Sequence, residues 1–288
     1  MKRLLLFILP LAIISMAFKS DQPAYQIFKQ DGKAIKYSKM LKDLEDADIV
    51  LFGELHNNPI CHWLQLEVTK NLFQLKADKL VMGAEMFEAD NQLVIDEYFA
   101  DYYPDKKFEA EARLWPNYKT DYKPLLEFAK ENKIPLIATN VPRRYASMVH
   151  KKGFESLDEL PEESKNYIAP LPIVYDANLP AYKEMMDMMK DMGHANENLP
   201  KAQAIKDATM AYFILQNLSA GQQFIHYHGS FHSDNFEGIM WYLQQAKPDL
   251  NILTSSSVEQ ADLNELAEEN LNKANFILVV DEDMTKTH

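Results

Sequence analysis

Two short polar signatures of the same type end two apolar runs that lie far apart in the sequence. The first is Gly53–His56 in LFGELHNN and the second is Gly229–His232 in HYHGSFHSDN, so each reads Gly-x-x-His. Glutamate and histidine side chains transfer protons, and glycine permits a close backbone approach where a strand turns into its loop. The repeated signature therefore suggests two walls of one site.

Other polar side chains follow the apolar runs in the same way. In an open parallel sheet, ligands bind beyond the C-terminal ends of the strands, so residues distant in sequence can meet there. We therefore expect one crevice that gathers the candidate catalytic residues. These are Glu54, His56, Glu85, Arg144, His228 and His232.

This set of residues allows two kinds of hydrolytic chemistry. Histidine and carboxylate side chains hold Zn or Mn, which activates water, and the metal ligands would then be His56, His232 and Glu54. Without a metal, Glu54 serves as the base and His232 as the acid, while Arg144 stabilises an oxyanion. The residue types leave both alternatives open, beside a purely structural one in which these side chains pair with one another or cap helices.

The apolar runs that must position these residues predict an α/β fold. Continuous apolar runs suit strands of a parallel sheet that is buried on both faces. Segments with helical periodicity lie between most of these apolar runs. One begins after Asn58-Pro59, where Asn can cap the helix and Pro can take its first position. This alternation predicts a largely parallel sheet flanked by helices. The predicted strands lie within residues 49–52, 80–88, 134–144, 223–232, 250–257 and 275–283.

One segment interrupts the alternation of strands and helices. Residues 151–200 contain no strand run, but they contain five prolines and amphipathic helical pieces. We interpret this segment as a helical lid insertion. The α/β sheet domain then comprises residues 24–150 and 201–283.

Charge and the N-terminal stretch restrict the class of protein. The 288 residues carry a formal net charge of −13, which argues against a nucleic-acid partner because such partners need a basic surface. Residues 1–17 combine two early positive charges with an apolar run and small residues at a plausible cleavage site, which predicts a secretory signal peptide; the alternative is an uncleaved anchor. No cysteine follows this run, so a lipid anchor on Cys is not supported, and the single Cys61 can form no internal disulfide.

The order of several motifs resembles one known family. GELHNN, GAEMFE, Asn-x-Pro-Arg, the helix AQAIKDATMA and HGSFH follow one another as in the ChaN-like haem-binding proteins, which belong with the TraB, Tiki and erythromycin-esterase-type proteins. The likeness covers about residues 25–283. It implies a Rossmann-like sheet with a small helical lid, in a bacterial protein of haem or iron uptake or storage. Such a protein would be secreted across the inner membrane and be periplasmic or associated with the cell envelope.

The resemblance also implies a haem site. In the family, a homodimer can enclose two stacked haems, a Tyr of one subunit ligates each iron, and a His and a Lys of the other hold the propionates. The outer-membrane haem uptake machinery is an expected partner. In this chain the lid supplies the matching residue types between Leu171 and His194: we expect Tyr182, or else Tyr175, as the iron ligand, with Lys183 and His194 at the propionates.

The chemistry of these residues suits haem. A phenolate is a hard anionic ligand for ferric iron, and cationic side chains bind carboxylates by charge-assisted hydrogen bonds. The methionines of this segment can line a flat apolar ligand. They can equally pack a helix against the sheet domain, or form a copper site through their thioethers.

Overall fold

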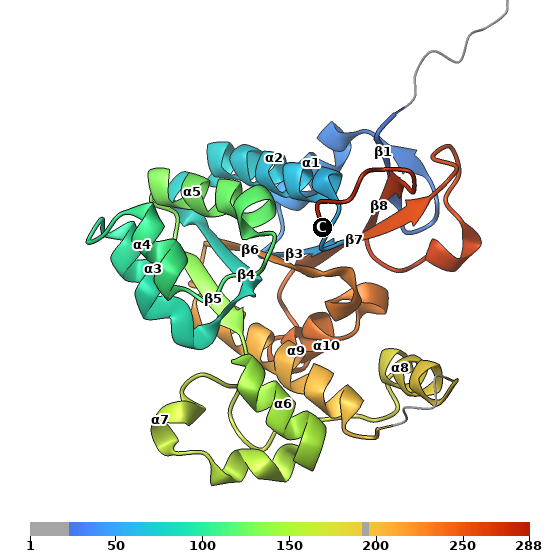
Figure 1. The fold of residues 1–288 in the computed structure, drawn as a ribbon. Helices are drawn as coiled ribbons and strands as arrows, with labels where there is room; N and C mark the ends of the chain where they lie inside the picture. Colours follow the sequence, from blue (N-terminus) through green and yellow to red (C-terminus); the bar gives the residue numbers. More distant parts are fainter. Residues whose placement is uncertain (1–22, 192–195) are drawn as a thin grey trace, which may run out of the picture.

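The computed structural model describes residues 23–191 and 196–288 (Figure 1). The predicted signal peptide and His194 lie outside these ranges. In the described part of the chain, one eight-stranded sheet has the order β2-β1-β8-β7-β3-β6-β4-β5. No helix of these same residues combines the length and the apolar character needed to cross a membrane.

Six parallel strands form the body of the sheet. They are β3 (Ile49–Glu54), β4 (Leu80–Glu88), β5 (Leu136–Asn140), β6 (Gln223–Gly229), β7 (Ile252–Gln260) and β8 (Phe276–Asp281). A hairpin of β1 (Tyr25–Lys29) and β2 (Ala34–Ile35) adds to the edge, with β1 antiparallel to β8. The mostly parallel sheet predicted from the apolar runs is therefore confirmed, and each of the six runs forms a strand.

Helices cover both faces of the sheet, which explains why the strands are continuously apolar. On β3, Val50 and Phe52 pack into the cluster on one face, while Ile49 and Leu51 pack into the cluster on the other. Figure 1 shows α1, α2 and α5 on the first face and α9 and α10 on the second. The helices of the two faces are α1 (Tyr37–Glu45), α2 (Pro59–Lys76), α3 (Gln92–Phe99), α4 (Asp105–Glu111), α5 (Lys123–Glu131), α9 (Leu199–Gln216) and α10 (Ile239–Ala246).

Helix α2 begins where the sequence predicts. The Asn58 side chain accepts hydrogen bonds from the backbone N–H groups of Ile60 and Cys61, and Pro59 occupies the first turn. Asn58 also donates to the Glu259 carboxylate at 3.1 Å. The helix is thereby fixed directly after the loop that follows β3.

The segment predicted as a lid is helical. It contains the end of α6 (Arg143–Lys152), a short 3-10 stretch at Phe154–Glu159, α7 (Glu162–Lys165) and α8 (Pro180–Asp191). No strand occurs among the described residues between 151 and 200. Figure 1 places α6 and α8 beside α9 and α7 beyond α6, all on the side of the molecule away from α1 and α2.

Candidate functional site

The C-terminal ends of β3, β4 and β6 lie next to one another. β6 pairs with both β3 and β4, and the last residue of β3, Glu54, pairs in register with Gly229. This register brings the two Gly-x-x-His signatures to one edge of the sheet. We call the side chains gathered there the strand-end cluster. It comprises Glu54, His56, His62, Glu85, Asp121, Asp207 and His232.

The glycines of the two signatures make this approach possible. A Cβ added at Gly53 would lie 2.8 Å from both the Ser230 Cα and the Ser255 carbonyl oxygen, which are backbone atoms with little room to move. A Cβ at Gly229 would lie 2.6 Å from the His56 Nε2 atom. Glycine is therefore required at Gly53, and at Gly229 it leaves the room that the His56 ring occupies.

The buried Glu54 carboxylate is the centre of the first half of the cluster. It accepts hydrogen bonds from the Tyr122 hydroxyl at 2.7 Å and from the Gln65 amide, and its Oε1 lies 2.8 Å from the His56 Nδ1 atom. Burial disfavours the ionised form, but the hydrogen bonds with His56 and His62 outweigh it and lower the pKa of Glu54 to about 2. Glu54 is therefore an ionised, fully partnered carboxylate.

His62 lies between two carboxylates. Its Nδ1 is 3.4 Å from a Glu54 oxygen, and its Nε2 is 3.4 Å from an Asp121 oxygen and 3.1 Å from the His56 carbonyl. Burial opposes a charge on the ring, but the neighbouring Glu54 carboxylate raises the pKa of His62. Because both ring nitrogens face oxygen acceptors, the ring of His62 is held in place and its protonated form is favoured.

The second half of the cluster repeats this arrangement around His232. The His232 Nε2 lies 3.2 Å from Glu85, and its Nδ1 lies 2.5 Å from Asp207, which comes from α9. The backbone N–H of Gly229 donates to Glu85 at 2.8 Å. Burial opposes the charge, but the two carboxylates raise the pKa of His232 to about 10. His232 is thus a second imidazolium between two carboxylates.

His56 differs from these two histidines. Its Nδ1 faces Glu54, but 41% of its side chain is exposed, and its ring meets the edge of Trp115 at 4.9 Å between centroids. Burial lowers the pKa of His56, but the hydrogen bond to Glu54 raises it. The net effect is a raised pKa. His56 is therefore the histidine of the cluster with a markedly exposed side chain.

The sequence predicts His228 in the same crevice, but in the structure His228 belongs to a separate series of uncharged, hydrogen-bonded side chains. Its Nδ1 lies 3.0 Å from the His226 Nδ1 and its Nε2 lies 2.8 Å from the Ser233 hydroxyl. Burial lowers the pKa of His228 to about 3. The ring is an uncharged part of the core beside the cluster.

Arg144 also lies away from the cluster. Its guanidinium pairs with Asp90 at 2.6 Å, donates to the Tyr145 hydroxyl and stacks over the Tyr145 ring, and about half of its side chain is exposed. Asp90 lies two residues beyond Glu88, the last residue of β4, and provides a nearer negative partner than the cluster does. The contacts of Arg144 give the expected oxyanion-stabilising role no support.

The alternative metal site is not supported either. Among residues 23–191 and 196–288, no group of three or more His, Cys, Asp or Glu side chains has an arrangement that could hold a metal ion. The physical reason is visible in the proposed ligands. Glu54 is occupied by Tyr122, Gln65 and His56, and both nitrogens of His232 face carboxylates.

Three residues of the cluster were missed in the sequence, namely His62, Asp121 and Asp207. A signal existed for His62, because His62, Gln65 and Thr69 recur at spacings of three and four along the predicted helix after Asn58-Pro59. This spacing places the three polar side chains on one helix face. In the structure, all three lie buried against the sheet.

A second candidate site lies at the lid. A hollow of about 390 Å³, which we call the tyrosine hollow, contains the expected iron ligands Tyr175 and Tyr182 and the expected propionate partner Lys183. The two tyrosine rings stack, with centroids 5.4 Å apart and planes inclined by 27°. Lys190 and Met186 of α8 and Pro200 of α9 also line this hollow. The fourth expected residue, His194, is outside the described residues.

The two tyrosines differ in exposure. Tyr175 is half-buried, whereas Tyr182 is only 2% exposed, and its hydroxyl lies beside the Tyr242 hydroxyl. Burial, and then the charge of Asp207, raise the pKa of the Tyr182 phenol. A ligand entering the hollow therefore meets Tyr175 more readily than the Tyr182 hydroxyl.

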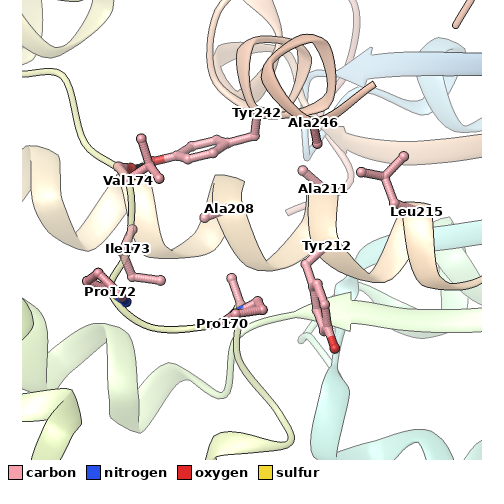
Figure 2. Close-up of a pocket in the computed structure, with 11 residues that line it drawn as sticks. Pro170, Pro172, Ile173, Val174, Ala208, Ala211, Tyr212, Leu215, Tyr242 and Ala246 are labelled. Carbon is pink, nitrogen blue, oxygen red and sulfur yellow. Dashed lines mark hydrogen bonds between the residues drawn. The ribbon is translucent and has the colours of Figure 1, made fainter. Parts of the chain in front are cut away.

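An apolar pocket of about 170 Å³ lies behind the loop that leads to Tyr175 (Figure 2). Pro170, Pro172 and Ile173 of this loop face Ala208 and Ala211 of α9. The Tyr242 hydroxyl of α10 donates to the Val174 carbonyl at 2.7 Å, directly before Tyr175. This contact fixes the loop from which Tyr175 projects.

We predict that the stability supplied by His232 depends on pH. The pKa of His232 rises from 6.5 to about 10 on folding, so its contribution is fully present below pH 6.5 and is lost as the pH rises towards 10. His232→Gln should lower the free energy of unfolding by about 3–5 kcal/mol at pH 6, because two buried carboxylates lose their partner. Denaturant unfolding at pH 6 and pH 9.5 should show a smaller loss at the higher pH.

His228→Gln is the matched control for this prediction. His228 is equally buried but neutral in the folded protein, and its lowered pKa means that only the unfolded state gains a proton near pH 6, so the cost of replacing His228 should not fall between pH 6 and pH 9.5 and should rise slightly. A cost of His232→Gln that is equal at the two pH values, or larger at pH 9.5 as for His228→Gln, would show that folding does not raise the pKa of His232.

Two known proteins are similar to this chain over much of its length. The structure of ChaN of Campylobacter jejuni, which shows cofacial haem binding, superposes with a TM-score of 0.68, covering 89% of this chain and 97% of that one at 17% identity. The protein RETICULATA-RELATED 5, chloroplastic, of Arabidopsis thaliana is 24% identical over 201 residues, which are 64% of this chain and 26% of the plant protein. The chain thus spans about a quarter of that relative's length, and the solved structure establishes the fold.

A family model extends this comparison to a named group. The family described as haem-binding uptake, Tiki superfamily, ChaN matches residues 40–243. The match includes β3 with its Gly-x-x-His signature, the lid and the second signature at the end of β6. Because it spans more than half of the 288 residues, the chain belongs to the ChaN family of haem-binding uptake proteins in the Tiki superfamily.

Proposed function

We propose that the protein binds haem in the tyrosine hollow and serves haem or iron uptake or storage in the cell envelope. One observation carries the proposal: in a member of a haem-binding family, two stacked tyrosines and two lysines line a single hollow. This combination offers a hard anionic ligand for iron and cations for the carboxylate groups of haem.

The residues of the hollow fit haem by their chemistry. Bound haem would supply ferric iron, a Lewis acid. Tyr175 or Tyr182 would hold it through a deprotonated phenol oxygen. Lys183 offers a cation for a haem carboxylate, whereas Lys190 pairs with Asp187 of the same hollow at 2.9 Å and would have to exchange that partner for a haem carboxylate. Met186 and Pro200 provide apolar surface for the macrocycle. Met186 therefore serves haem contact in this proposal, rather than a copper site.

The proposal includes two further elements that come from the family. A second copy of the chain would close the open side of the hollow, giving a homodimer when haem is bound. Delivery to the periplasm or envelope is supported by the signal-like residues 1–17, and exchange with the outer-membrane haem uptake machinery would follow from that location.

We predict that removing both phenol groups abolishes iron ligation. The Tyr175→Phe, Tyr182→Phe double variant keeps both rings and their packing but has no oxygen for the iron. Its affinity for ferric hemin should fall at least about tenfold, and the visible absorption band of iron–phenolate ligation should vanish. Hemin titration followed by absorption spectroscopy measures both effects.

Metal-free protoporphyrin is the control ligand for the double variant. It should still bind, because it contacts the lysines and the apolar surface without needing an iron ligand. The haem proposal would be wrong if the double variant kept the wild-type hemin spectrum and affinity.

A second candidate function is acid–base hydrolysis at the strand-end cluster. It is favoured by the Glu54–His56 pair, in which a buried carboxylate holds one nitrogen of a histidine whose ring is partly exposed. In this role His56 Nε2 takes a proton from water, and Glu54 stabilises the resulting imidazolium. The roles first expected of Glu54 as base and His232 as acid change accordingly, because both are fully paired.

We predict that any such hydrolysis depends on His56. With a panel of p-nitrophenyl esters, His56→Gln should lower kcat/KM by about 100-fold, while replacement of the exposed His288 should have no effect. Glu54 raises the pKa of His56, so the rate should increase with pH through a midpoint above the usual histidine range, and Glu54→Gln should move that midpoint down. Equal rates for His56→Gln and the wild type would exclude this candidate.

We predict that protein isolated from the cell envelope lacks residues 1–17. N-terminal sequencing should find a start near Phe18.

Size-exclusion chromatography of the same protein should show a shift from monomer to dimer when hemin is added. A chain that still begins at Met1, or a monomer at saturating hemin, would contradict the corresponding part of the proposal.

A further inference from the structure

Three arginines gather around two carboxylates beyond the ends of β4 and β5. Glu88, the last residue of β4, accepts hydrogen bonds from Arg113 Nε at 3.0 Å and from Arg143 Nε at 2.8 Å. Asp90 pairs with Arg113 and, at 2.6 Å, with Arg144. The five side chains therefore form a continuous series of alternating charge, which we call the arginine row.

The carboxylates of the arginine row are covered, whereas its guanidinium groups face solvent. The side chains of Glu88 and Asp90 are 6% and 11% exposed, but those of Arg113, Arg143 and Arg144 are 45%, 71% and 49% exposed. Three positive and two negative groups leave one net positive charge, in a chain whose formal charge is −13. Because two arginines would balance the two carboxylates, the third positive charge is available to an external anion.

Arg143 is the member of the row with free donors. Glu88 divides its two oxygens between two arginines, so neither forms a two-point pair with it. Arg143 uses Nε alone, and in the described part of the chain its two Nη atoms have no hydrogen-bond partner. Arg144, in contrast, uses both Nη atoms, for Asp90 and for the Tyr145 hydroxyl. A guanidinium with a free pair of donors matches the geometry of a phosphate or a carboxylate.

The start of α6 also favours an anion beside Arg143. Arg143 is the first residue of this ten-residue helix, and Pro142 before it provides no side-chain cap. The first N–H groups of a helix lack partners within the helix and carry partial positive charge. Two consecutive arginines at this end oppose the helix dipole, so their placement does not serve the stability of α6.

The loop that supplies Arg113 also reaches His56. Trp115, two residues further along, meets the His56 ring at 4.9 Å between centroids. The Asn117 amide donates a hydrogen bond to the His56 carbonyl at 2.8 Å. The arginine row is thus connected to the strand-end cluster through the loop that contacts its exposed histidine.

We propose that the arginine row binds an oxyanion group, a phosphate or a carboxylate, of a small-molecule ligand, with Arg143 as its principal donor. The two Nη atoms of Arg143 would donate to two oxygens of the anion, and Arg113 would add the positive charge of the next guanidinium. Glu88 and Asp90 are internal counter-ions that hold the three guanidinium groups together without the ligand. None of these residues lines the tyrosine hollow, so the inference does not depend on haem binding.

The test follows the binding of inorganic phosphate to the full chain by NMR. The three tryptophans, Trp63, Trp115 and Trp241, give three indole N–H signals, and the Trp115→Phe variant identifies that of Trp115. Phosphate should shift the Trp115 signal in a saturable way, because Trp115 lies two residues from Arg113, while the Trp241 signal of α10 should not move. Sodium chloride at equal ionic strength should not reproduce the shift. Acetate titrated in the same way shows which of the two oxyanions binds more tightly.

Substitutions at Arg143 test its role as donor. Arg143→Gln should weaken phosphate binding at least about tenfold, because hydrogen bonds to a charged group are lost. Arg143→Lys keeps the charge but lacks the planar fork, so it should also weaken binding, by a smaller factor.

Lys79→Gln is the matched control. It removes one positive charge from an exposed residue directly before β4, at the opposite end of the strand that ends in Glu88. Its affinity for phosphate should equal that of the wild type. Circular dichroism confirms that each variant is folded.

Four results would overturn the inference. They are an unchanged Trp115 signal in phosphate, an equal shift in chloride, equal losses of affinity in Arg143→Gln and Lys79→Gln, and wild-type affinity in Arg143→Lys. The second and third would mean that the row responds only to ionic strength or net charge. The fourth would mean that the fork of Arg143 takes no part in binding.

Discussion

Burying carboxylates at the ends of central strands is the constraint that organises this molecule. Glu54 and Glu85 end or nearly end strands that are covered by helices on both faces, and an unpaired charge there would cost several kcal/mol. Each is balanced by an imidazolium, His62 or His232, and each imidazolium is held from its other side by an aspartate, Asp121 or Asp207. The two signatures in the sequence thus correspond to two similar units, each with a histidine held between two carboxylates.

This balance has consequences for chemistry. A histidine that faces carboxylates with both nitrogens cannot exchange protons freely or bind a metal ion, so His62 and His232 serve to hold charge in place. His56 shares Glu54 with His62 but keeps one side of its ring open, and it alone in the cluster combines a carboxylate partner with marked exposure. Pairing, more than residue type, decides which histidine can react.

The parallel strands could be predicted from the sequence, because burial on both faces requires continuous apolar runs. The polar residues that follow these runs could then be assigned to the ends of the strands. The nearness of Glu54, His56, Glu85 and His232 also followed, since parallel strands share one C-terminal edge. Asp121 and Asp207 could not be found, because they come from helical segments whose rotation against the sheet depends on packing. Arg144 was misplaced for a related reason: a nearby aspartate, Asp90, competes for it, and such competition is decided in three dimensions. The residue types indicated a haem site at the two tyrosines. Which of the two phenols a ligand meets first depends on their exposure, and exposure is decided by how the loop and α8 pack.

Helix α9 supplies one wall to both sites with the same face. A substitution selected for a better fit in the hollow would move Gln203 or Asp207 relative to His232, and a change in the charge balance of His232 would alter the surroundings of Tyr182. The two sites cannot accumulate mutations independently. Variation along this face should therefore be strongly epistatic, with Pro200, Gln203 and Asp207 constrained as one unit during the divergence of related proteins.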